Sequence, residues 1–172
     1  MTLAHLLERA GIESVILESQ SREYVEKRIR AGVLEQGTVD LFRELGLADR
    51  LELEGIEHRG IIMRFDGEDH RIAFDQYGDK SIWIYGQQEV VRDLISARVR
   101  LDSPLVFDAQ VMDIEGLDTD PVVINYVDRE GSQQLTCDIV AGCDGFHGVS
   151  RQSIPAGSIR EYVHDYPFGW LG

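Results

Sequence analysis

The stretch LAHLLERAGIESVILE, residues 3–18, decides the fold. Its apolar residues from Leu3 to Ala10 follow a helical spacing, and Gly11 marks the end of that helix. Residues 14–18 are β-branched and aliphatic, as is typical of a short buried strand, and they end in the acid Glu18. Helix, glycine, strand and acid make the second half of a βαβ dinucleotide-binding unit. We therefore predict an α/β fold with an incomplete Rossmann-like domain, whose first strand and glycine-rich turn would stand before residue 1.

The rest of the chain alternates between helical and strand patterns, with antiparallel excursions beside the parallel strands. Asp66-Gly67 is typical of a hairpin turn, and Gly46 is expected to end a helix. The predicted elements are one helix or two short ones over 32–47, a hairpin of strands 59–66 and 70–75, a strand at 82–85, a helix over 87–101, and strands at 105–115, 121–128 and 134–141. The last of these is expected to be buried and to run into a tight loop.

The composition argues against several classes of protein. The 172 residues include 31 acidic and 17 basic side chains, a formal charge of −14, which disfavours a general binder of nucleic acid or anionic membranes. No apolar run approaches the ~20 residues that a membrane span needs. The two cysteines, Cys137 and Cys143, form no CxxC, and the five histidines are scattered, so neither a disulfide framework nor a metal site is indicated. We expect a cytoplasmic protein.

Two candidate sites lie near the predicted strand ends of the first half. Glu18 occupies the position at which a Rossmann-type acid accepts hydrogen bonds from a ribose, although an ordinary exposed glutamate would fit there equally well. Arg28 and Arg30 stand beside Gly32 and a predicted helix start, where guanidinium groups and free N–H groups suit a pyrophosphate. The alternative for this pair is a solvated basic turn.

The most informative stretch is residues 139–151, IVAGCDGFHGVSR. Glycines on both sides of Cys143-Asp144 permit a sharp turn that brings backbone close to a ligand. Gly148 and the following Ser150-Arg151 open a helix whose N-terminus suits an anion. His147 has the alternative reading of a surface or capping residue. No G-x-S-x-G elbow supports a Ser-His-Asp triad, and no carboxylate pair indicates a glycosidase.

These motifs resemble the class A FAD-dependent aromatic hydroxylases, and among them the 4-hydroxybenzoate 3-monooxygenase family. The resemblance extends over essentially the whole chain and implies a GR2-type FAD-binding domain. The matching strings are Gly11-x4-Ile-Leu-Glu18, RIRAGVLEQG at 28–37, Tyr85-Gly-Gln87, GCDGFHGVSRQSIP at 142–155 and YPFGWLG at 166–172.

The resemblance implies FAD as cofactor, NADPH as co-substrate, O2, and 4-hydroxybenzoate as the substrate that becomes 3,4-dihydroxybenzoate. Flavin supplies the redox chemistry, and the protein supplies orientation and charge. The implied NADPH contacts are His147, Arg151 and Tyr24, the last in a loop that selects the coenzyme. In the family an Arg often follows the ribose-binding acid, but this sequence has Ser19 there, so the preference between NADPH and NADH stays open. The implied FAD contacts are Glu18, Arg28, Ile29, Arg30, Ala31, Gly32, Val33, Gln87, Asp144 and Gly145.

The same resemblance implies that residues 1–172 are a partial FAD/NAD(P)-binding domain. Residues 59–86 and the tail from about 160 are expected to contribute to smaller or substrate-domain sheets, with catalytic residues beyond Gly172 and a homodimer for the full-length family. Without the first strand, we expect these residues alone neither to hold FAD tightly nor to turn over. Two alternatives stay open: a related monooxygenase acting on another phenol, and a non-catalytic remnant or one half of a split protein.

Overall fold

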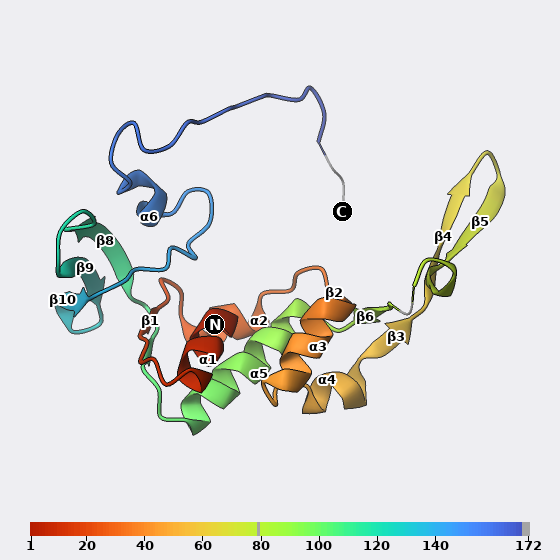
Figure 1. The fold of residues 1–172 in the computed structure, drawn as a ribbon, viewed down its shortest axis with the longest axis horizontal. Coiled ribbons are helices and arrows are strands. Elements are labelled where there is room, and N and C mark those ends of the chain that lie inside the picture. Colours follow the sequence, from red (N-terminus) through yellow and green to blue (C-terminus); the bar gives the residue numbers. More distant parts are fainter. Residues whose placement is uncertain (79, 170–172) are drawn as a thin grey trace. The chain divides into compact units, whose positions relative to one another are not determined.

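The computed structural model describes residues 1–78 and 80–169, which divide into two compact units, Met1–Ala109 and the chain from Gln110 onward. Residue 79, inside the 59–86 segment, and residues 170–172, which end the aromatic tail, lie outside the described residues. The first unit contains most of the helices (Figure 1). Its elements are α1 (Thr2–Arg9), β1 (Ile16–Leu17), α2 (Arg22–Lys27), β2 (Val33–Glu35), α3 (Gln36–Glu44), α4 (Asp49–Glu54), β3 (Ile56–His58), β4 (Gly60–Phe65), β5 (Glu68–Ala73), the 3-10 turn η1 (Phe74–Gln76), β6 (Ile82–Ile84), α5 (Gln87–Arg100) and β7 (Leu105–Val106).

The helix, glycine and strand predicted at the start of the chain are confirmed. Helix α1 ends in a left-handed glycine, Gly11, at φ +73°. The N–H of Gly11 donates to the carbonyl of Glu8, and the N–H of Ile12 donates to that of Leu7, both at 2.9 Å, which satisfies carbonyls at the helix end. Strand β1 is shorter than predicted and pairs in parallel with β7. This parallel pair beside helices confirms the α/β class.

The predicted helix over 32–47 is wrong in its first turn. Residues 33–35 form strand β2, which pairs antiparallel with β6 through Val33 and Ile84, and the helix α3 begins only at Gln36. Strand β6 also pairs with β3, so a three-stranded antiparallel sheet forms in the order β2-β6-β3. The predicted end of this helical region is confirmed, since α3 ends at Glu44 and Gly46 follows in the left-handed conformation at φ +69°.

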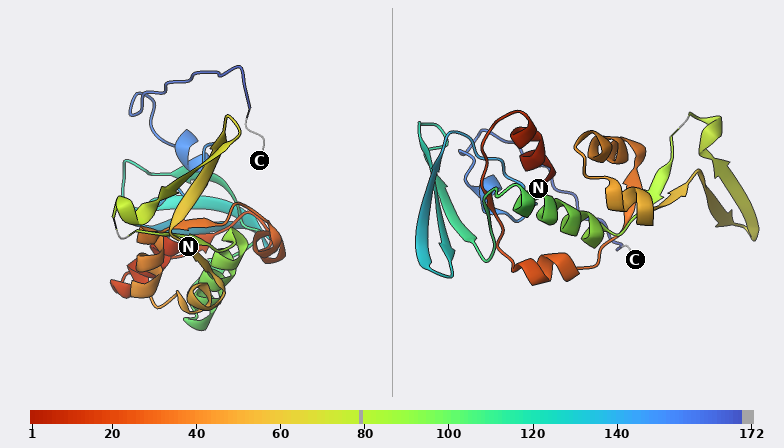
Figure 2. Two further views of the ribbon diagram at one scale, coloured as in Figure 1. Left: turned by 90° about the vertical axis from the view of Figure 1, so that its right-hand side faces the viewer. Right: turned by 90° about the horizontal axis from the view of Figure 1, so that it is seen from below.

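The predicted hairpin is confirmed as strands β4 and β5. Their turn places Asp66 at φ 54° and Gly67 at φ 81°, as a two-residue primed turn requires. Within the first unit this hairpin projects away from the helices (Figures 1 and 2).

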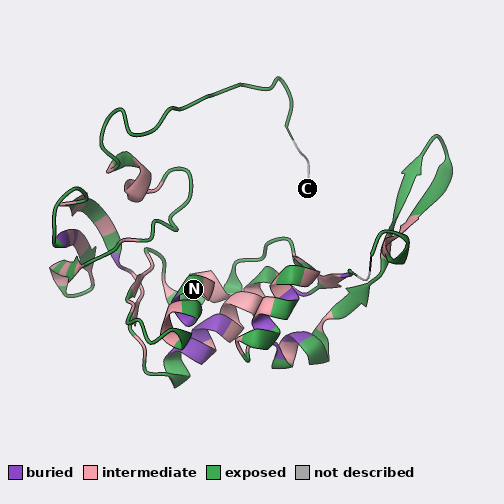
Figure 3. Ribbon diagram, viewed as in Figure 1, coloured by how far each residue is buried: buried purple, intermediate pink, exposed green. Residues whose placement is uncertain are grey.

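The core of the first unit lies between helices and the end of β6. Helix α5 runs between α1 and α2 in the right-hand view of Figure 2. Buried His5 of α1 lies 3.1 Å, through Nε2, from the carbonyl oxygen of Leu94. Buried residues concentrate along α5 and its neighbours, whereas the β4–β5 hairpin is mostly exposed (Figure 3). The main cluster consists of Val39, Phe42, Ala48, Leu51, Tyr85 and Leu94.

The second unit is an antiparallel meander followed by a short helix. It contains β8 (Gln110–Glu115), β9 (Val122–Asp128), β10 (Gly131–Cys137) and α6 (Val149–Gln152), and the sheet order is β10-β9-β8. The predicted strand at 105–115 is in fact two strands, β7 and β8, because the backbone turns at Asp108, which has φ 55°. The two halves also pair differently, since β7 is parallel to β1 and β8 is antiparallel to β9.

The predicted buried strand at 134–141 is wrong in its second half. Pairing with β9 ends at Cys137, which faces Val122, and none of the described residues pairs with 138–141. Ile139 is 85% exposed as a result. Among the described helices, none is both long and apolar enough to cross a membrane.

Candidate functional site

Glu18 follows β1 directly and is held there by its backbone. Its N–H donates to the carbonyl of Val106, and its own carbonyl accepts from the N–H of Ala109, each at 2.9 Å. The side-chain oxygen Oε1 accepts from the N–H of Gln20 at 2.8 Å. Within the described part of the chain, no group donates to the other oxygen, Oε2. One oxygen therefore orients the carboxylate, and the other is available to a ligand hydroxyl.

Arg28 and Arg30 lie in the connection between α2 and β2. The predicted helix start beside them is wrong, because β2 intervenes before α3. The Arg28 guanidinium lies 5.7 Å from the centre of the Tyr24 ring. Neither arginine has a carboxylate partner among the described residues, even though the chain carries 31 acids. Two unpaired guanidinium groups on one short segment are suited to a phosphate-rich anion.

Gly32 brings this segment against the N-terminus of α5. A Cβ atom on Gly32 would lie 2.7 Å from Cα of Gly86 and 2.8 Å from the carbonyl oxygen of Tyr85. The N–H of Tyr85 donates to the carbonyl of Gly32 at 2.8 Å, and Gly86 is the N-cap of α5, so the exposed Gln87 begins that helix. The structure thus brings Gly32 against the backbone that leads into Gln87, in a space that a side chain would fill, and residues 28–31 precede this contact. Such bare backbone permits a close approach by a ligand.

A partly buried polar network holds Tyr85, which forms one side of this contact. The Tyr85 hydroxyl donates to Asp93 Oδ2 at 2.6 Å, and Arg50 contacts the other oxygen of Asp93 at 2.6 Å. Burial, together with the hydrogen bond and charge of Asp93, raises the pKa of the Tyr85 phenol above its ordinary value. Tyr85 therefore stays neutral and holds the Gly86 turn on α5. Sequence reasoning missed this role, since a Tyr and an Asp eight positions apart form no recognisable motif.

Tyr24, predicted to lie in a loop, is on helix α2 instead. Ser21 caps this helix by accepting the N–H of Tyr24 at 3.2 Å. Ion pairs one turn apart, Arg22–Glu26 at 2.7 Å and Lys27–Glu23 at 2.6 Å, follow the spacing that stabilises short helices. The Tyr24 side chain is 46% exposed and contacts Arg28.

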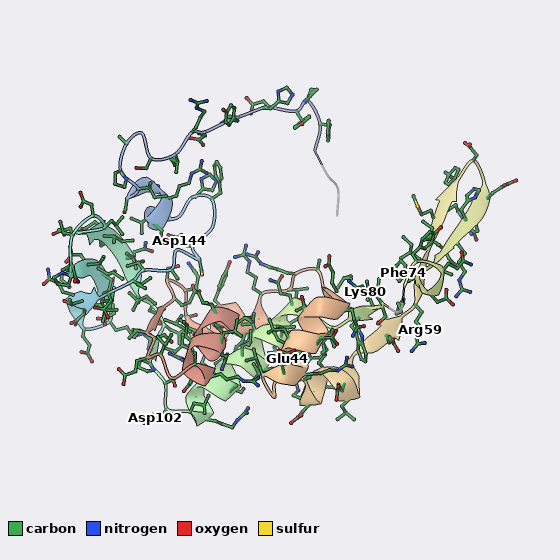
Figure 4. The ribbon with its side chains drawn as sticks, in the orientation of Figure 1. Glu44, Arg59, Phe74, Lys80, Asp102 and Asp144 are labelled. Atoms are coloured by element: carbon green, nitrogen blue, oxygen red, sulfur yellow. The ribbon has the colours of Figure 1, made fainter. Side chains whose placement is uncertain are left out.

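In the second unit, Asp144 organises the loop before α6 (Figure 4). Its Oδ2 accepts the N–H of Ser150 at 2.9 Å. A Cβ atom on Gly148 would lie 2.0 Å from Asp144 Cγ, so only glycine leaves room for the carboxylate there. Gly145 has φ +77°, which favours glycine. The Asp144 carboxylate is thus used within the loop, and what the loop offers to a ligand is its backbone.

Lowering the pH will release this loop below the ordinary carboxyl pKa of 3.8. Burial raises the pKa of Asp144, but hydrogen bonds from the backbone and side chain of Ser150 and from the N–H groups of Asp144 and Val149 outweigh it, and the net pKa is lowered. A lowered folded-state pKa stabilises the loop above the unfolded-state value, and that stability is lost as the pH falls through the folded-state value. The Ser150 amide shift in NMR will report this titration.

The matched variants for this titration are Asp144→Asn and Asp138→Asn. Asp144→Asn should remove the acid titration of the Ser150 amide, whereas Asp138→Asn, a nearby exposed carboxylate, should leave it unchanged. If the Ser150 amide shift does not change with pH in the unmodified protein, Asp144 does not hold the loop through the Ser150 N–H.

The two predicted NADPH contacts in this unit share an aromatic neighbour. His147 meets the Phe146 ring edge-on with centroids 5.0 Å apart, and the Arg151 guanidinium lies 4.2 Å from the centre of the same ring. Arg151 also pairs with Glu161 at 2.7 Å. The predicted helix after Gly148 is confirmed as α6, although it spans only four residues. The described residues contain no group of three or more His, Cys, Asp or Glu that could hold a metal ion.

Comparisons with known proteins give one consistent family. The family described as "FAD binding domain" matches residues 1–172. A p-hydroxybenzoate hydroxylase from Acinetobacter baylyi is 39% identical over 173 aligned residues, which cover all of this chain and 43% of that protein. The FAD-dependent monooxygenase penE from Penicillium thymicola is 24% identical over 160 residues, or 90% of this chain and 32% of that protein. The chain therefore spans less than half the length of these relatives.

Solved structures of similar fold include two from pseudomonads. The p-nitrophenol 4-monooxygenase PnpA from Pseudomonas putida DLL-E4 superposes with a TM-score of 0.78 at 23% identity, covering 89% of this chain and 40% of that one. The probable FAD-dependent monooxygenase pqsL from Pseudomonas aeruginosa gives 0.75 at 19% identity, covering 96% and 44%. At these identities the likeness concerns the fold alone.

Proposed function

The chain belongs to the FAD binding domain family, and from this premise we propose that it forms the flavin-binding part of a FAD-dependent monooxygenase that hydroxylates a phenol. The observation that carries the proposal is the contact of Gly32 with Gly86, beside two arginines without acidic partners. Family membership alone would leave open which residues take part. Bare backbone, two free guanidinium groups and a carboxylate with one free oxygen together match the phosphates and ribose of a dinucleotide.

Each residue has a role that follows from its contacts. Glu18 accepts a ribose hydroxyl through Oε2, because Oε1 already accepts the N–H of Gln20. Arg28 and Arg30 neutralise the pyrophosphate, Ile29 separates them, and Ala31 links Arg30 to Gly32. Gly32 and Val33 offer backbone toward the flavin, with Gln87 beside them at the start of α5. When bound, FAD supplies the redox chemistry that passes an oxygen atom from O2 to the substrate.

The second unit contributes a loop rather than a charge. Since the Asp144 carboxylate accepts N–H groups of its own loop, its role is to hold Gly145 in a conformation that exposes backbone to FAD. His147 and Arg151 are proposed as NADPH contacts of the second unit, and Tyr24 is proposed as one of the first. Arg151 must exchange its partner Glu161 for a phosphate to do so.

The proposed substrate is 4-hydroxybenzoate, converted to 3,4-dihydroxybenzoate with NADPH and O2. Support comes from the Acinetobacter baylyi relative, which is named for this activity and is 39% identical over the whole chain. We assign no catalytic residue within residues 1–172, and propose that the protein acts in the cytoplasm as a homodimer, as the family resemblance suggests.

The test is a visible absorbance spectrum of the natively purified enzyme of which this chain is proposed to form the flavin-binding part, followed by NADPH oxidation with 4-hydroxybenzoate and product analysis. Flavin bands and formation of 3,4-dihydroxybenzoate are the expected results. If flavin bands are present but only another phenol stimulates NADPH oxidation, the proposed substrate is wrong and the proposed enzyme class stands. A protein without flavin bands that also fails to bind added FAD would overturn the proposal.

A further inference from the structure

Arg98 of α5 is the largest fully buried side chain among the described residues. It is only 1% exposed, although arginine is almost always partly exposed in folded proteins. Burying a charge is unfavourable unless hydrogen bonds and an opposite charge compensate for it. The partners that compensate Arg98 therefore show what the guanidinium holds in place.

The partners of Arg98 come from three separate segments. Its Nη1 donates to Glu8 Oε2 of α1 at 3.2 Å. Its Nη2 contacts the Ser14 carbonyl, the Ser14 hydroxyl at 3.0 Å and the Pro104 carbonyl at 3.3 Å. Glu8 also accepts the Ser103 hydroxyl at 2.7 Å, through its other oxygen. One buried guanidinium thus joins α1, α5 and the segments that lead into β1 and β7.

The contacts of Arg98 with Ser14 and Pro104 lie where the two parallel strands begin, and Glu18 lies where they end. Ser14 lies two residues before β1, and Pro104 lies immediately before β7, so Arg98 holds the parallel pair at its amino end. Glu18 leaves the carboxyl end of the same pair and is bonded there to Val106 and Ala109. Strand β1 pairs with β7 through only Ile16 and Leu17, so the register of this short pair decides which β7 groups the Glu18 backbone meets.

We propose that Arg98 is a positioning residue that sets the register of β1 against β7 and so places the Glu18 carboxylate for the ribose of the AMP half of FAD. This inference rests on the proposed function for the role of Glu18, but the effect of Arg98 on strand register is a property of the unliganded chain. Lysine cannot replace it, since an ammonium lacks the planar fork that reaches Glu8, Ser14 and Pro104 together.

The first measurement requires no ligand. Hydrogen exchange of the Glu18 and Ala109 amides will be compared in the unmodified chain, in Arg98→Lys, and in Arg100→Lys as the matched control. Arg100 is exposed on the same helix and has no charged partner within the described ranges. We expect both amides to lose protection in Arg98→Lys and to keep it in Arg100→Lys. Unchanged protection of both amides in a folded Arg98→Lys protein would overturn the proposal.

The second measurement separates positioning from general stability. FAD contains the AMP ribose and FMN does not, so a defect that acts through Glu18 lowers affinity for FAD alone. Arg98→Lys should weaken FAD binding about tenfold, the effect of losing one hydrogen bond to a charged group, and leave FMN binding unchanged. In a Glu18→Ala background the same substitution should weaken FAD binding no further. Equal losses for FAD and FMN would overturn the positioning role.

A milder variant keeps the test decisive if Arg98→Lys does not fold. Ser14→Ala removes one hydroxyl partner of Arg98 and leaves the ion pair with Glu8 intact. Like Arg98→Lys, it should reduce hydrogen-exchange protection of the Glu18 amide and weaken FAD binding, but both effects should be smaller. If the unmodified chain binds no FAD, the proposed function fails, while the exchange measurement still decides the role of Arg98 in strand register.

Discussion

Replacing Gly32 with valine will abolish measurable FAD binding and lower the melting temperature of the protein. The new Cβ would lie 2.7 Å from Cα of Gly86 and 2.8 Å from the carbonyl oxygen of Tyr85, and both are backbone atoms that cannot rotate away. Relieving such overlap costs typically about 1–3 kcal/mol, or roughly 5–20 °C in a unit of this size. The segment that carries Arg28 and Arg30 must then move away from α5. Calorimetry and a flavin fluorescence titration measure the two effects.

Gly37→Ala is the matched control for this prediction. Gly37 lies in the first turn of α3, and a Cβ there would meet nothing within 4 Å. Alanine should stabilise the helix by about 0.5–1 kcal/mol and leave FAD binding unchanged. If Gly32→Val binds FAD as well as Gly37→Ala does, the close approach of Gly32 and Gly86 has no part in the site.

Removing both guanidinium groups, by Arg28→Gln with Arg30→Gln, will weaken FAD binding about 100-fold. Each charge-assisted hydrogen bond to phosphate is worth roughly a factor of ten or more in affinity. Stability should change little, since both side chains are exposed and neither has an acidic partner in the described part of the chain. Fluorescence titrations at low and high salt are the measurement, and the double variant should lose most of the salt dependence.

Arg100→Gln is the charge-matched control for the arginine pair. It removes an exposed positive charge from the far end of α5. If this variant weakens FAD binding as much as a single substitution at Arg28 or Arg30, then net charge explains the effect and a specific pyrophosphate site does not.

Elements with strong local signals were predictable from the sequence. Helix α1 and its end at Gly11, helix α5, and the hairpin around Asp66-Gly67 all follow from periodicity, a left-handed glycine or a turn dipeptide. Helix α2 was missed because it has no buried residue, so no apolar periodicity marks it. Its capping serine and its ion pairs were present in the sequence but are weak signals.

Two segments were predicted wrongly because their structure depends on distant partners. Strand β2 has the apolar pair Val33-Leu34 directly before a helical pattern, and only its pairing with β6 shows that it is a strand. Residues 139–141 have a strand-like composition but no partner among the described residues, so they stay outside the sheet. Strand identity is a property of the pair, and a single segment does not contain it.

The candidate site divides in the same way. Glu18 and the arginine pair are predictions from residue type and spacing, whereas the contact of Gly32 with Gly86 and the buried positions of Tyr85 and Arg98 depend on contacts across the fold. Arg98 follows Leu94 and Ile95 at helical spacing and so lies on the buried face of α5, but the sequence alone does not show which partners compensate its charge there.

A fluorescence titration of FAD with the 172-residue chain shows whether this chain contains the dinucleotide contacts of a FAD site. We expect saturable quenching that ADP reverses by competition, with an affinity too weak for the flavin to remain bound through gel filtration. The matched Arg28→Gln, Arg30→Gln chain should show no saturation in the same range. Quenching that ADP cannot reverse, or that is equal in both chains, would mean that the chain lacks these dinucleotide contacts.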